Sequence, residues 1–289
     1  MSVKMIQERL DGYRCRSTLE EDHALREITQ EIVLAGLGRT TFFNHAAFHG
    51  GTCLRIFHGL NRFSEDLDFA LMAPDAKFSL QSFLSAVRDE VSAYGCQLEI
   101  DDRSRLGQAV QKAFVKESSL GGVLRLNYRP STGPMRKIRI KLEVDTNPPL
   151  GANWVMPILD FPFASAVKTH DLPSLFAGKM HALLCREYHK GRDWYDLVWY
   201  TAQRVPINHR LLDAALDQQG PWRGTQPKTD ATWCVARIRE RIEVLDVDQL
   251  RHEVLPFVKA EEQPSLSLWS ADFFRQQVGK LTMPGTPLD

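Results

Sequence analysis

Apolar residues recur at helical spacing near the amino terminus of the chain. They follow Ser17-Thr18-Leu19-Glu20, in which a hydroxyl residue stands three positions before a glutamate, as in a helix capping box. The apolar positions are Leu25, Ile28, Ile32 and Val33. Gly36 and Gly38 end the pattern, so we expect a first amphipathic helix between Ser17 and these glycines.

Shorter elements are expected next. Thr40–Ala47 is predicted to be a short helix, and a further helix is predicted to begin at Thr52, after the Gly50-Gly51 pair, and to reach Gly59. From Asp66 to Leu71 the sequence DLDFAL alternates polar with apolar residues and then becomes wholly apolar, which predicts a strand with one buried face. Because alternate side chains of a strand share a face, Asp66 and Asp68 are expected to point the same way.

A sheet is predicted around this strand. Phe78–Tyr94 is amphipathic at helical period and is expected to cover the sheet. Four further extended segments are expected at Gln97–Ile100, Val110–Val115, Val123–Tyr128 and Lys137–Val144. The last has the clearest alternation, because Arg139, Lys141, Glu143 and Asp145 alternate with apolar residues. The sheet is therefore expected to be largely antiparallel, with one charged face on its last strand.

The second half of the chain has mainly helical patterns. Helices are predicted at Leu172–Tyr188, Asp193–Gln203, His209–Leu216, Thr232–Ile242, Val247–Val258 and Ala271–Leu281. A chain of 289 residues is long enough for two domains. We place the boundary near residue 165, which predicts an α+β architecture: a mixed sheet flanked by helices over residues 1–165, then an all-helical domain over 166–289.

Composition narrows the classes of protein that fit. Hydrophobic residues make up 43% and charged residues 25% of the chain, as in an ordinary folded protein. Lys plus Arg equals Asp plus Glu at 36 each, so only a local patch can attract nucleic acid. The amino terminus lacks a signal-peptide core and no stretch is apolar enough to span a bilayer, so we expect a cytoplasmic protein with no membrane partner. The five cysteines form no CxxC pair, which argues against a zinc site or a disulfide framework.

The strongest chemical signal is the segment His49–Arg55 (HGGTCLR), followed shortly by Asn61–Asp68 (NRFSEDLD). Two carboxylates on one face of a strand, Asp66 and Asp68, can jointly hold divalent cations that bridge to the phosphates of a nucleotide. Two bound Mg²⁺ ions would activate the attacking oxygen and neutralise the leaving pyrophosphate. Taken alone, Asp-x-Asp would more often mark a solvated edge strand than a metal site, and the nearby glycine pair shifts the interpretation to the metal site.

Other residues of these segments are candidates for phosphate binding. The Gly50-Gly51-Thr52 turn opens a helix, whose free backbone N–H groups can meet phosphates without obstruction by side chains. Arg62 and Ser64 lie close to the carboxylates in sequence and can contact the same phosphates. Metal sites of this type need a third acid, and Glu143 is preferred over Asp145 on the best-patterned strand.

A second cluster of polar residues lies in the helical half, at Gly178–Arg186 and Lys190–Leu197. Apolar residues account for the packing of the first helix, which leaves Lys179 to face a cleft. The ammonium group of a lysine can neutralise a triphosphate, or it can lower the pKa of a nucleophile. Asp193 and Asp196, one helical turn apart, can orient that lysine or act as a general base.

Together the GGT turn, the Arg-x-Ser-x-Asp-x-Asp segment, the mid-chain lysine and the Arg-Asp-x-x-Asp helix start resemble the AbiEii/AbiGii toxin family of nucleotidyltransferases. The resemblance runs from about Phe43 to Trp199. It implies a nucleotidyltransferase fold in which Asp66 and Asp68 bind the metal and Lys179 is the essential lysine. It also implies that Arg62 and Ser64 adjoin the nucleotide and that Asp196, with Asp193, is the acid of the later motif. We expect Arg192 and Asp193 to bind the nucleotide as well, and Asp196 to help activate the acceptor hydroxyl.

The family resemblance implies a toxin of a bacterial toxin–antitoxin or phage-defence system with a separately encoded antitoxin as partner. The expected reaction transfers a nucleoside monophosphate from a nucleoside triphosphate of unknown base to an acceptor and releases pyrophosphate. Relatives act on RNA, including tRNA 3′ ends, and the helical domain is expected to complete the active-site cleft. Two alternatives remain: a protein or small-molecule acceptor, and a catalytically silent regulator that binds nucleotide.

Overall fold

The computed structural model describes residues 2–93, 97–102, 119–128 and 136–282. The chain divides into two compact units. Unit 1 comprises Met1–Gly59, Phe63–Pro148 and Trp154–Thr169, and unit 2 comprises Leu60–Arg62, Pro149–Asn153 and His170–Asp289. Unit 2 therefore includes two short segments, Leu60–Arg62 and Pro149–Asn153, that precede its main segment in the sequence.

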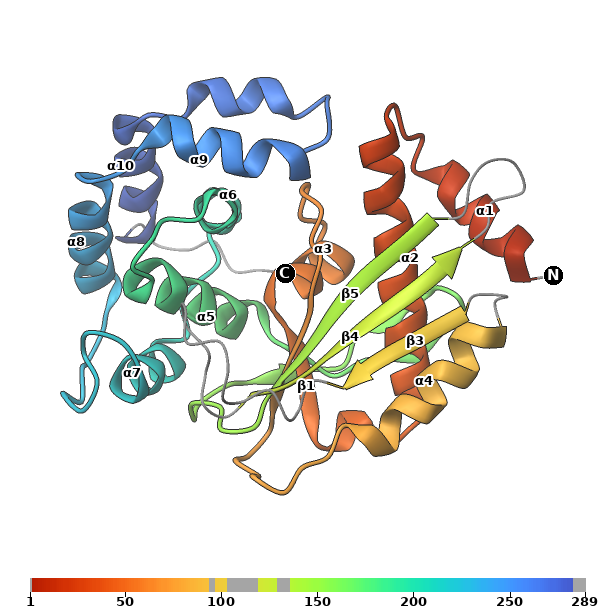
Figure 1. Ribbon diagram of the computed structural model, residues 1–289. Coiled ribbons are helices and arrows are strands. Elements are labelled where there is room, and N and C mark those ends of the chain that lie inside the picture. The colour runs from red at the N-terminus through yellow and green to blue at the C-terminus, as the bar shows by residue number, and fades with distance from the viewer. Residues whose placement is uncertain (1, 94–96, 103–118, 129–135, 283–289) are drawn as a thin grey trace. The chain divides into compact units, whose positions relative to one another are not determined.

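Unit 1 is built on a mixed β-sheet with the strand order β3-β4-β5-β2-β1-β9-β6 (Figure 1). The strands are β1 (Ala46–His49), β2 (Leu67–Leu71), β3 (Gln97–Asp102), β4 (Ser119–Tyr128), β5 (Arg136–Asp145), β6 (Trp154–Val155) and β9 (Thr169–His170), while β7 (Ile158–Leu159) and β8 (Ser165–Ala166) form a separate pair. Strand β2 pairs antiparallel with β1 and parallel with β5. The predicted strands at β2, β3, β4 and β5 are confirmed, and the one predicted at Val110–Val115 lies outside the described residues.

Helices cover this sheet as the amphipathic patterns predict. Unit 1 contains α1 (Ser2–Gly12), α2 (Thr18–Gly38), the short 3₁₀ helix η1 (Phe42–Asn44), α3 (Gly50–His58) and α4 (Gln81–Ala93). The backbone N–H of Glu20 donates to the Ser17 hydroxyl at 3.2 Å, which confirms the predicted cap of α2. Helices α2 and α4 lie side by side on one face of the sheet (Figure 1).

The predicted helix at Thr40–Ala47 is wrong. The chain forms η1 there and then strand β1, in which Ala46, Ala47 and Phe48 are each fully buried. Strand β1 lies inside the sheet, between β2 and β9, and the burial of consecutive residues shows that both of its faces are covered. A short, wholly apolar run has no alternation that would separate a doubly covered strand from a helix.

Unit 2 is mainly helical. It contains α5 (Leu172–Cys185), α6 (Gly191–Ala202), α7 (His209–Gln218), α8 (Ala231–Ile242), α9 (Val247–Val254) and α10 (Ala271–Gly279), with 3₁₀ helices η2 (Leu255–Phe257), η3 (Gln263–Leu268) and η4 (Lys280–Thr282). The six helices predicted for this half are confirmed, with ends that differ by a few residues. Helix α6 is central, because it contacts α5, α9 and α10 and its Trp194 is fully buried against Phe274. No helix among the described residues is long and apolar enough to cross a membrane.

A buried group of charges ties the first three helices of unit 1 together. Glu31 on α2 accepts from Arg9 on α1 at 2.6 Å. Glu27 on α2 accepts from the Tyr13 hydroxyl and from Nε of Arg55 on α3, each at 2.9 Å. Burial opposes the charge of Glu31 more strongly than Arg9 favours it, and raises the pKa of Glu31 to about 7. Helix α3, which carries the glycine pair, is thus held to α2 by ionic contacts.

We expect the Glu31→Gln variant to change how stability depends on pH. Because the folded-state pKa of Glu31 lies above the ordinary value of 4.5, its stabilising contribution is complete below pH 4.5 and is lost as the pH rises through about 7. The variant should therefore gain stability relative to the wild type as the pH rises, by about 1–3 kcal/mol. Thermal unfolding across this range measures the difference. Glu8→Gln, at an exposed position of α1, is the matched control, and an equal pH profile for both variants would contradict the assignment.

Candidate functional site

The pairing of β2 with its neighbours gathers acidic side chains on one face of the sheet in unit 1. Asp68 lies opposite Glu143 of β5 and opposite His49 of β1. Residues in register on adjacent strands share a face, so Asp68 and Glu143 face the same side, away from the core residues Leu67 and Phe69. Asp66 precedes the first residue of β2 by one position. The sequence-predicted Asp66 and Asp68 thus stand at the start of a central strand.

The glycine turn that opens α3 lies directly against Asp68. Gly50 has a φ of +80°, a left-handed conformation that glycine adopts without steric cost. A Cβ atom at this position would lie 2.6 Å from Oδ2 of Asp68, closer than real contacts of this kind. The backbone of the turn can approach the carboxylate only because residue 50 has no side chain. Gly50 therefore allows the turn to pack directly against the carboxylate of Asp68.

Two side chains hold the backbone that leads into β2. The buried hydroxyl of Thr52 donates to the carbonyl of Asp66, so the first turn of α3 is tied to the start of the strand. Gln30 of α2 donates through Nε2 to the carbonyl of Ser64 at 3.3 Å. These contacts position the Ser64–Asp66 segment next to the glycine turn. They give Thr52 an anchoring role that the sequence, which marked it for phosphate binding, did not predict.

The two candidates for a third carboxylate differ in their surroundings. Glu143 lies opposite Asp68 and accepts a hydrogen bond from the ammonium group of Lys141, two residues before it on β5. Asp145 lies opposite Ala70, is buried, and accepts from the backbone N–H of Asn147 at 3.1 Å. The register therefore brings Glu143, and not Asp145, level with Asp68.

The raised pKa of Lys141 shows that this face is negatively charged. Partial burial lowers the pKa of Lys141, but Glu143, Asp66 and Asp68 together outweigh burial and raise it. Carboxylate oxygens are the ligands that Mg²⁺ prefers, so the donor chemistry of Asp66, Asp68 and Glu143 fits a magnesium ion. Among the described residues no three His, Cys, Asp or Glu side chains already converge as a complete metal-binding group.

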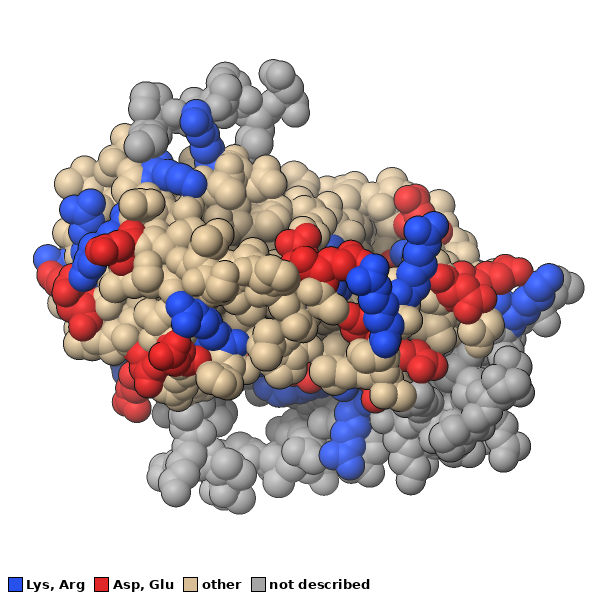
Figure 2. Space-filling view, turned by 90° about the horizontal axis from the view of Figure 1, so that it is seen from above, with Lys and Arg blue, Asp and Glu red and all other residues tan. Residues whose placement is uncertain are grey.

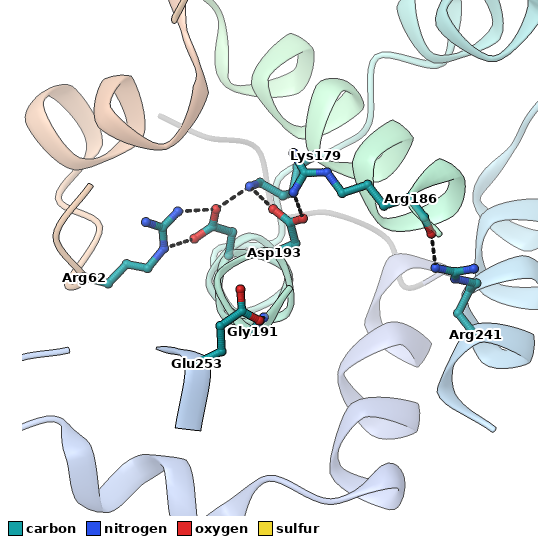
Figure 3. Close-up of polar contacts among 8 residues, drawn as sticks. Arg62, Lys179, Arg186, Gly191, Asp193, Arg241 and Glu253 are labelled. Atoms are coloured by element: carbon teal, nitrogen blue, oxygen red, sulfur yellow. Dashed lines mark hydrogen bonds and ion pairs between the residues drawn. The ribbon is translucent and has the colours of Figure 1, made fainter. Parts of the chain in front are cut away.

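Unit 2 carries a separate, buried ionic network (Figure 3). Nε and Nη2 of Arg62 donate to the two carboxylate oxygens of Asp196, each at 2.6 Å. The side chain of Arg62 is 2% exposed and that of Asp196 is fully buried. Burial lowers the pKa of Arg62, and the charge and hydrogen bonds of Asp196 outweigh it and raise the pKa. Arg62, four residues before Asp66 in sequence, thus belongs by its contacts to the helical unit.

Lys179 of α5 joins both acids of α6. Its Nζ lies 2.7 Å from Oδ1 of Asp193 and 2.7 Å from Oδ2 of Asp196. Asp193 also accepts from Nη1 of Arg186, at 2.5 Å. Burial alone would raise the pKa of Asp193, but Lys179 and Arg186 outweigh burial and lower it. The sequence left Asp193 and Asp196 either as orienting groups or as a general base, and this geometry supports orientation, because oxygens of both acids already contact Lys179.

The network has an excess of positive charge. Arg62, Lys179 and Arg186 oppose Asp193 and Asp196, which leaves one net positive charge among these five groups. Lys179 and Arg186 retain partial exposure, with 15% and 32% of their side chains accessible, whereas the acids are buried. An anion can therefore reach the cations of this network more easily than a cation can reach its carboxylates. This arrangement suits the phosphates of a nucleotide.

Residues of α9 hold the first turn of α6 in place. The backbone N–H of Gly191 donates to Glu253 at 2.7 Å, and a Cβ on Gly191 would lie 2.2 Å from the Leu250 carbonyl (Figure 3). The guanidinium of Arg192 lies 4.4 Å from the centroid of the Phe257 ring. Arg192, predicted to adjoin the nucleotide, therefore stacks on an aromatic residue beside the ionic network. Glu253 was not identified from the sequence, because its partner is the backbone N–H of Gly191, which is distant in sequence and leaves no local pattern.

Comparison with one solved structure supports a nucleotidyltransferase fold. The chain resembles a candidate nucleotidyltransferase from H. pylori, with a TM-score of 0.50, 17% sequence identity, and coverage of 89% of this chain and 91% of that one. A second similar structure is JHP933 from Helicobacter pylori, with a TM-score of 0.48, 15% identity, and coverage of 90% and 89%. No curated protein sequence matches the chain.

A family model identifies the chain more closely. The model described as "Nucleotidyl transferase AbiEii toxin, Type IV TA system" matches residues 32–277. The chain therefore belongs to the AbiEii family and is a nucleotidyltransferase toxin of a type IV toxin–antitoxin system, as the motifs in the sequence predict. Membership implies a nucleoside triphosphate substrate, a divalent metal typical of the class, and an antitoxin partner.

The contact between Gly50 and Asp68 leads to a paired test. In Gly50→Ala the new methyl group must displace the Asp68 carboxylate, so pyrophosphate release should fall by about tenfold to a hundredfold. Gly59→Ala introduces the same backbone strain at a φ of +73°, with no atom within 4 Å of the new Cβ. The backbone strain should cost each variant about 1 kcal/mol of stability, to which Gly50→Ala adds the cost of moving Asp68. Equal activity in the two variants would show that the close approach to Asp68 has no catalytic role.

The Arg62–Asp196 pair predicts strong coupling between two residues 134 positions apart in sequence. Arg62→Met leaves Asp196 paired with Lys179 and should cost less than Asp196→Leu, which removes the carboxylate that the buried Arg62 binds and should destabilise unit 2 by about 3–5 kcal/mol. The double variant should recover a large part of that loss, because it strands neither partner. Urea unfolding followed by tryptophan fluorescence measures this, since five of the six tryptophans belong to unit 2. Additive losses would contradict the pairing.

Proposed function

We propose that this toxin transfers a nucleoside monophosphate from a nucleoside triphosphate to a hydroxyl group on RNA, with the tRNA 3′ end as the favoured acceptor. The acceptor hydroxyl loses its proton to solvent as its oxygen bonds to the α-phosphorus, the bond from that phosphorus to the bridging oxygen breaks, and pyrophosphate leaves. The observation that carries the proposal is the placement of Asp68 in register with Glu143 and against the glycine turn at Gly50. Carboxylates and a turn able to receive phosphate thus occur together on one face.

In this proposal Asp66, Asp68 and Glu143 hold Mg²⁺, in a two-ion site. The ions would supply activation of the attacking oxygen and neutralisation of the leaving group. Gly50 and Gly51 present backbone N–H groups at the first turn of α3, where a phosphate gains from the helix dipole. Ser64 adjoins this turn through the backbone segment that Gln30 and Thr52 hold.

Unit 2 contributes the positive charge in this proposal. Lys179 neutralises the triphosphate. Arg192, in the first turn of α6, and Arg186, which contacts Asp193 of α6, are further cations. Asp193 and Asp196 are positioning residues: they hold the Lys179 ammonium group by two contacts of 2.7 Å. Arg62 acts through Asp196, which it fixes by a bidentate contact. We propose that both units are needed for one turnover.

The acceptor is the least constrained part of the proposal. Support for RNA comes from the resemblance to toxins that modify RNA. On the face drawn in Figure 2, acidic and basic side chains are interspersed over the described residues, consistent with the zero net charge. RNA recognition would then depend on local contacts. A protein or small-molecule acceptor is the second candidate, favoured by that same charge balance. The reaction would take place in the cytoplasm, where the nucleotides and RNA are available.

The decisive experiment incubates the purified toxin with Mg²⁺, total bacterial RNA and each α-labelled nucleoside triphosphate in turn. We expect label on a tRNA-sized band for one base, and none with Asp66→Asn, Asp68→Asn or Lys179→Met. Loss of a metal ligand or of the triphosphate cation should lower the rate by at least about a thousandfold.

Matched controls use exposed residues of the same unit and type. Asp89→Asn in unit 1 and Lys228→Met in unit 2 make the same changes of charge at exposed positions and should keep full activity. Label on protein or on a small molecule in place of RNA would move the proposal to the second candidate. Full activity of folded Asp68→Asn or Lys179→Met protein would overturn the assignment of that residue.

A further inference from the structure

Lys141 lies on the acidic face of unit 1, and neither the motifs nor the family assignment give it a role. It is on β5, two residues before Glu143, so alternation on the strand puts both side chains on the same face. The Lys141 ammonium group donates a hydrogen bond to Glu143. Since Asp68 is in register with Glu143, the lysine is attached to the carboxylate that would be the third metal ligand.

The charges around Lys141 are those a divalent cation would meet. Asp66, Asp68 and Glu143 each interact electrostatically with Lys141. Three carboxylates on one sheet face repel one another, and a single ammonium group offsets part of that repulsion. The lysine therefore supplies, from within the chain, some of the positive charge that a metal ion supplies when it binds.

The lysine side chain can also withdraw. It is 55% exposed and has a flexible four-carbon stem, whereas Glu143 is 31% exposed. An exposed pair of this kind contributes little to stability, so a divalent cation can break it at small cost. An arginine at this position would bind the carboxylate through two parallel hydrogen bonds and release it less readily.

We propose that Lys141 is a built-in counter-cation that competes with the divalent metal for Glu143. It holds this carboxylate in the metal-free enzyme. When metal binds, Lys141 releases the carboxylate and its ammonium group moves into solvent on its flexible stem. The inference rests on the proposed assignment of Asp66, Asp68 and Glu143 as metal ligands. It predicts that the resting affinity for metal is lower than the carboxylates alone would provide. Metal loading then depends on breaking one defined contact.

The first test measures Mn²⁺ binding to the full-length toxin without nucleotide, by electron paramagnetic resonance of the free ion. Lys141→Met should bind Mn²⁺ about two- to fivefold more tightly than the wild type, as expected for loss of an exposed competing pair. Arg139→Met is the matched control, because it removes one positive charge from an exposed position two residues earlier on the same strand. It should change the affinity by less than Lys141→Met does.

The outcomes separate this inference from the proposed function. If the wild type binds no Mn²⁺, or Asp68→Asn binds it equally well, the metal assignment fails and the inference fails with it. If binding requires Asp68 but Lys141→Met equals the wild type or the Arg139→Met control, or binds more weakly, only the counter-cation inference is overturned. Lys141→Gln repeats the test should Lys141→Met not fold, as judged by circular dichroism.

A second measurement observes the displacement directly. In protein with ¹³C-labelled lysine, the Cε resonance of Lys141, assigned by its loss in Lys141→Gln, should shift on titration with Mg²⁺ and saturate at the concentration that saturates metal binding. The same titration of Asp68→Asn should leave the resonance in place. A Lys141 resonance that ignores Mg²⁺ in wild-type protein competent to bind metal would show that the contact with Glu143 persists, and would refute the competition.

Discussion

The parallel pairing of β2 with β5 is the constraint on which the acidic site depends. It sets Asp68 level with Glu143, while the neighbouring antiparallel strand β1 leads directly into the glycine turn. A slip of one residue in the β2–β5 register would move Asp68 or Glu143 to the core face, which holds Leu142 and Val144. The burial of that core face therefore specifies the register, and the register in turn specifies which carboxylates can act together.

In unit 2 the main constraint is the burial of the Asp196 carboxylate. A fully buried carboxylate is costly unless its oxygens are paired, and Asp196 meets this condition through Arg62 and Lys179. Such an arrangement contributes little net stability compared with a well-packed apolar core, and its benefit is geometric. It fixes the ammonium group of Lys179 between two acids of α6, with a side chain that is still partly accessible. A lysine held in this way needs no reorganisation before it meets an anion.

The sequence predicted the periodic parts of this fold and missed those without a period. Helix α2, strand β5 and the helices of unit 2 have apolar positions that repeat, so their local pattern is enough. The helix predicted at Thr40–Ala47 runs into the start of strand β1, because Ala46 and Ala47 are both buried and show no alternation. Likewise the Asp-x-Asp pair is visible as a motif, whereas the Arg62–Asp196 contact joins residues 134 positions apart and leaves no local signal.

The same distinction explains Lys141. Its alternation with Glu143 placed it on the charged face of the predicted strand, where a lysine normally serves solubility. Only the register between β2 and β5 shows that Asp68 stands opposite its partner Glu143. Local charge also reconciles the site with the zero net charge of the chain: the acidic face of unit 1 attracts cations and the network of unit 2 attracts anions. Local fields of opposite sign in the two units need no overall excess of either charge.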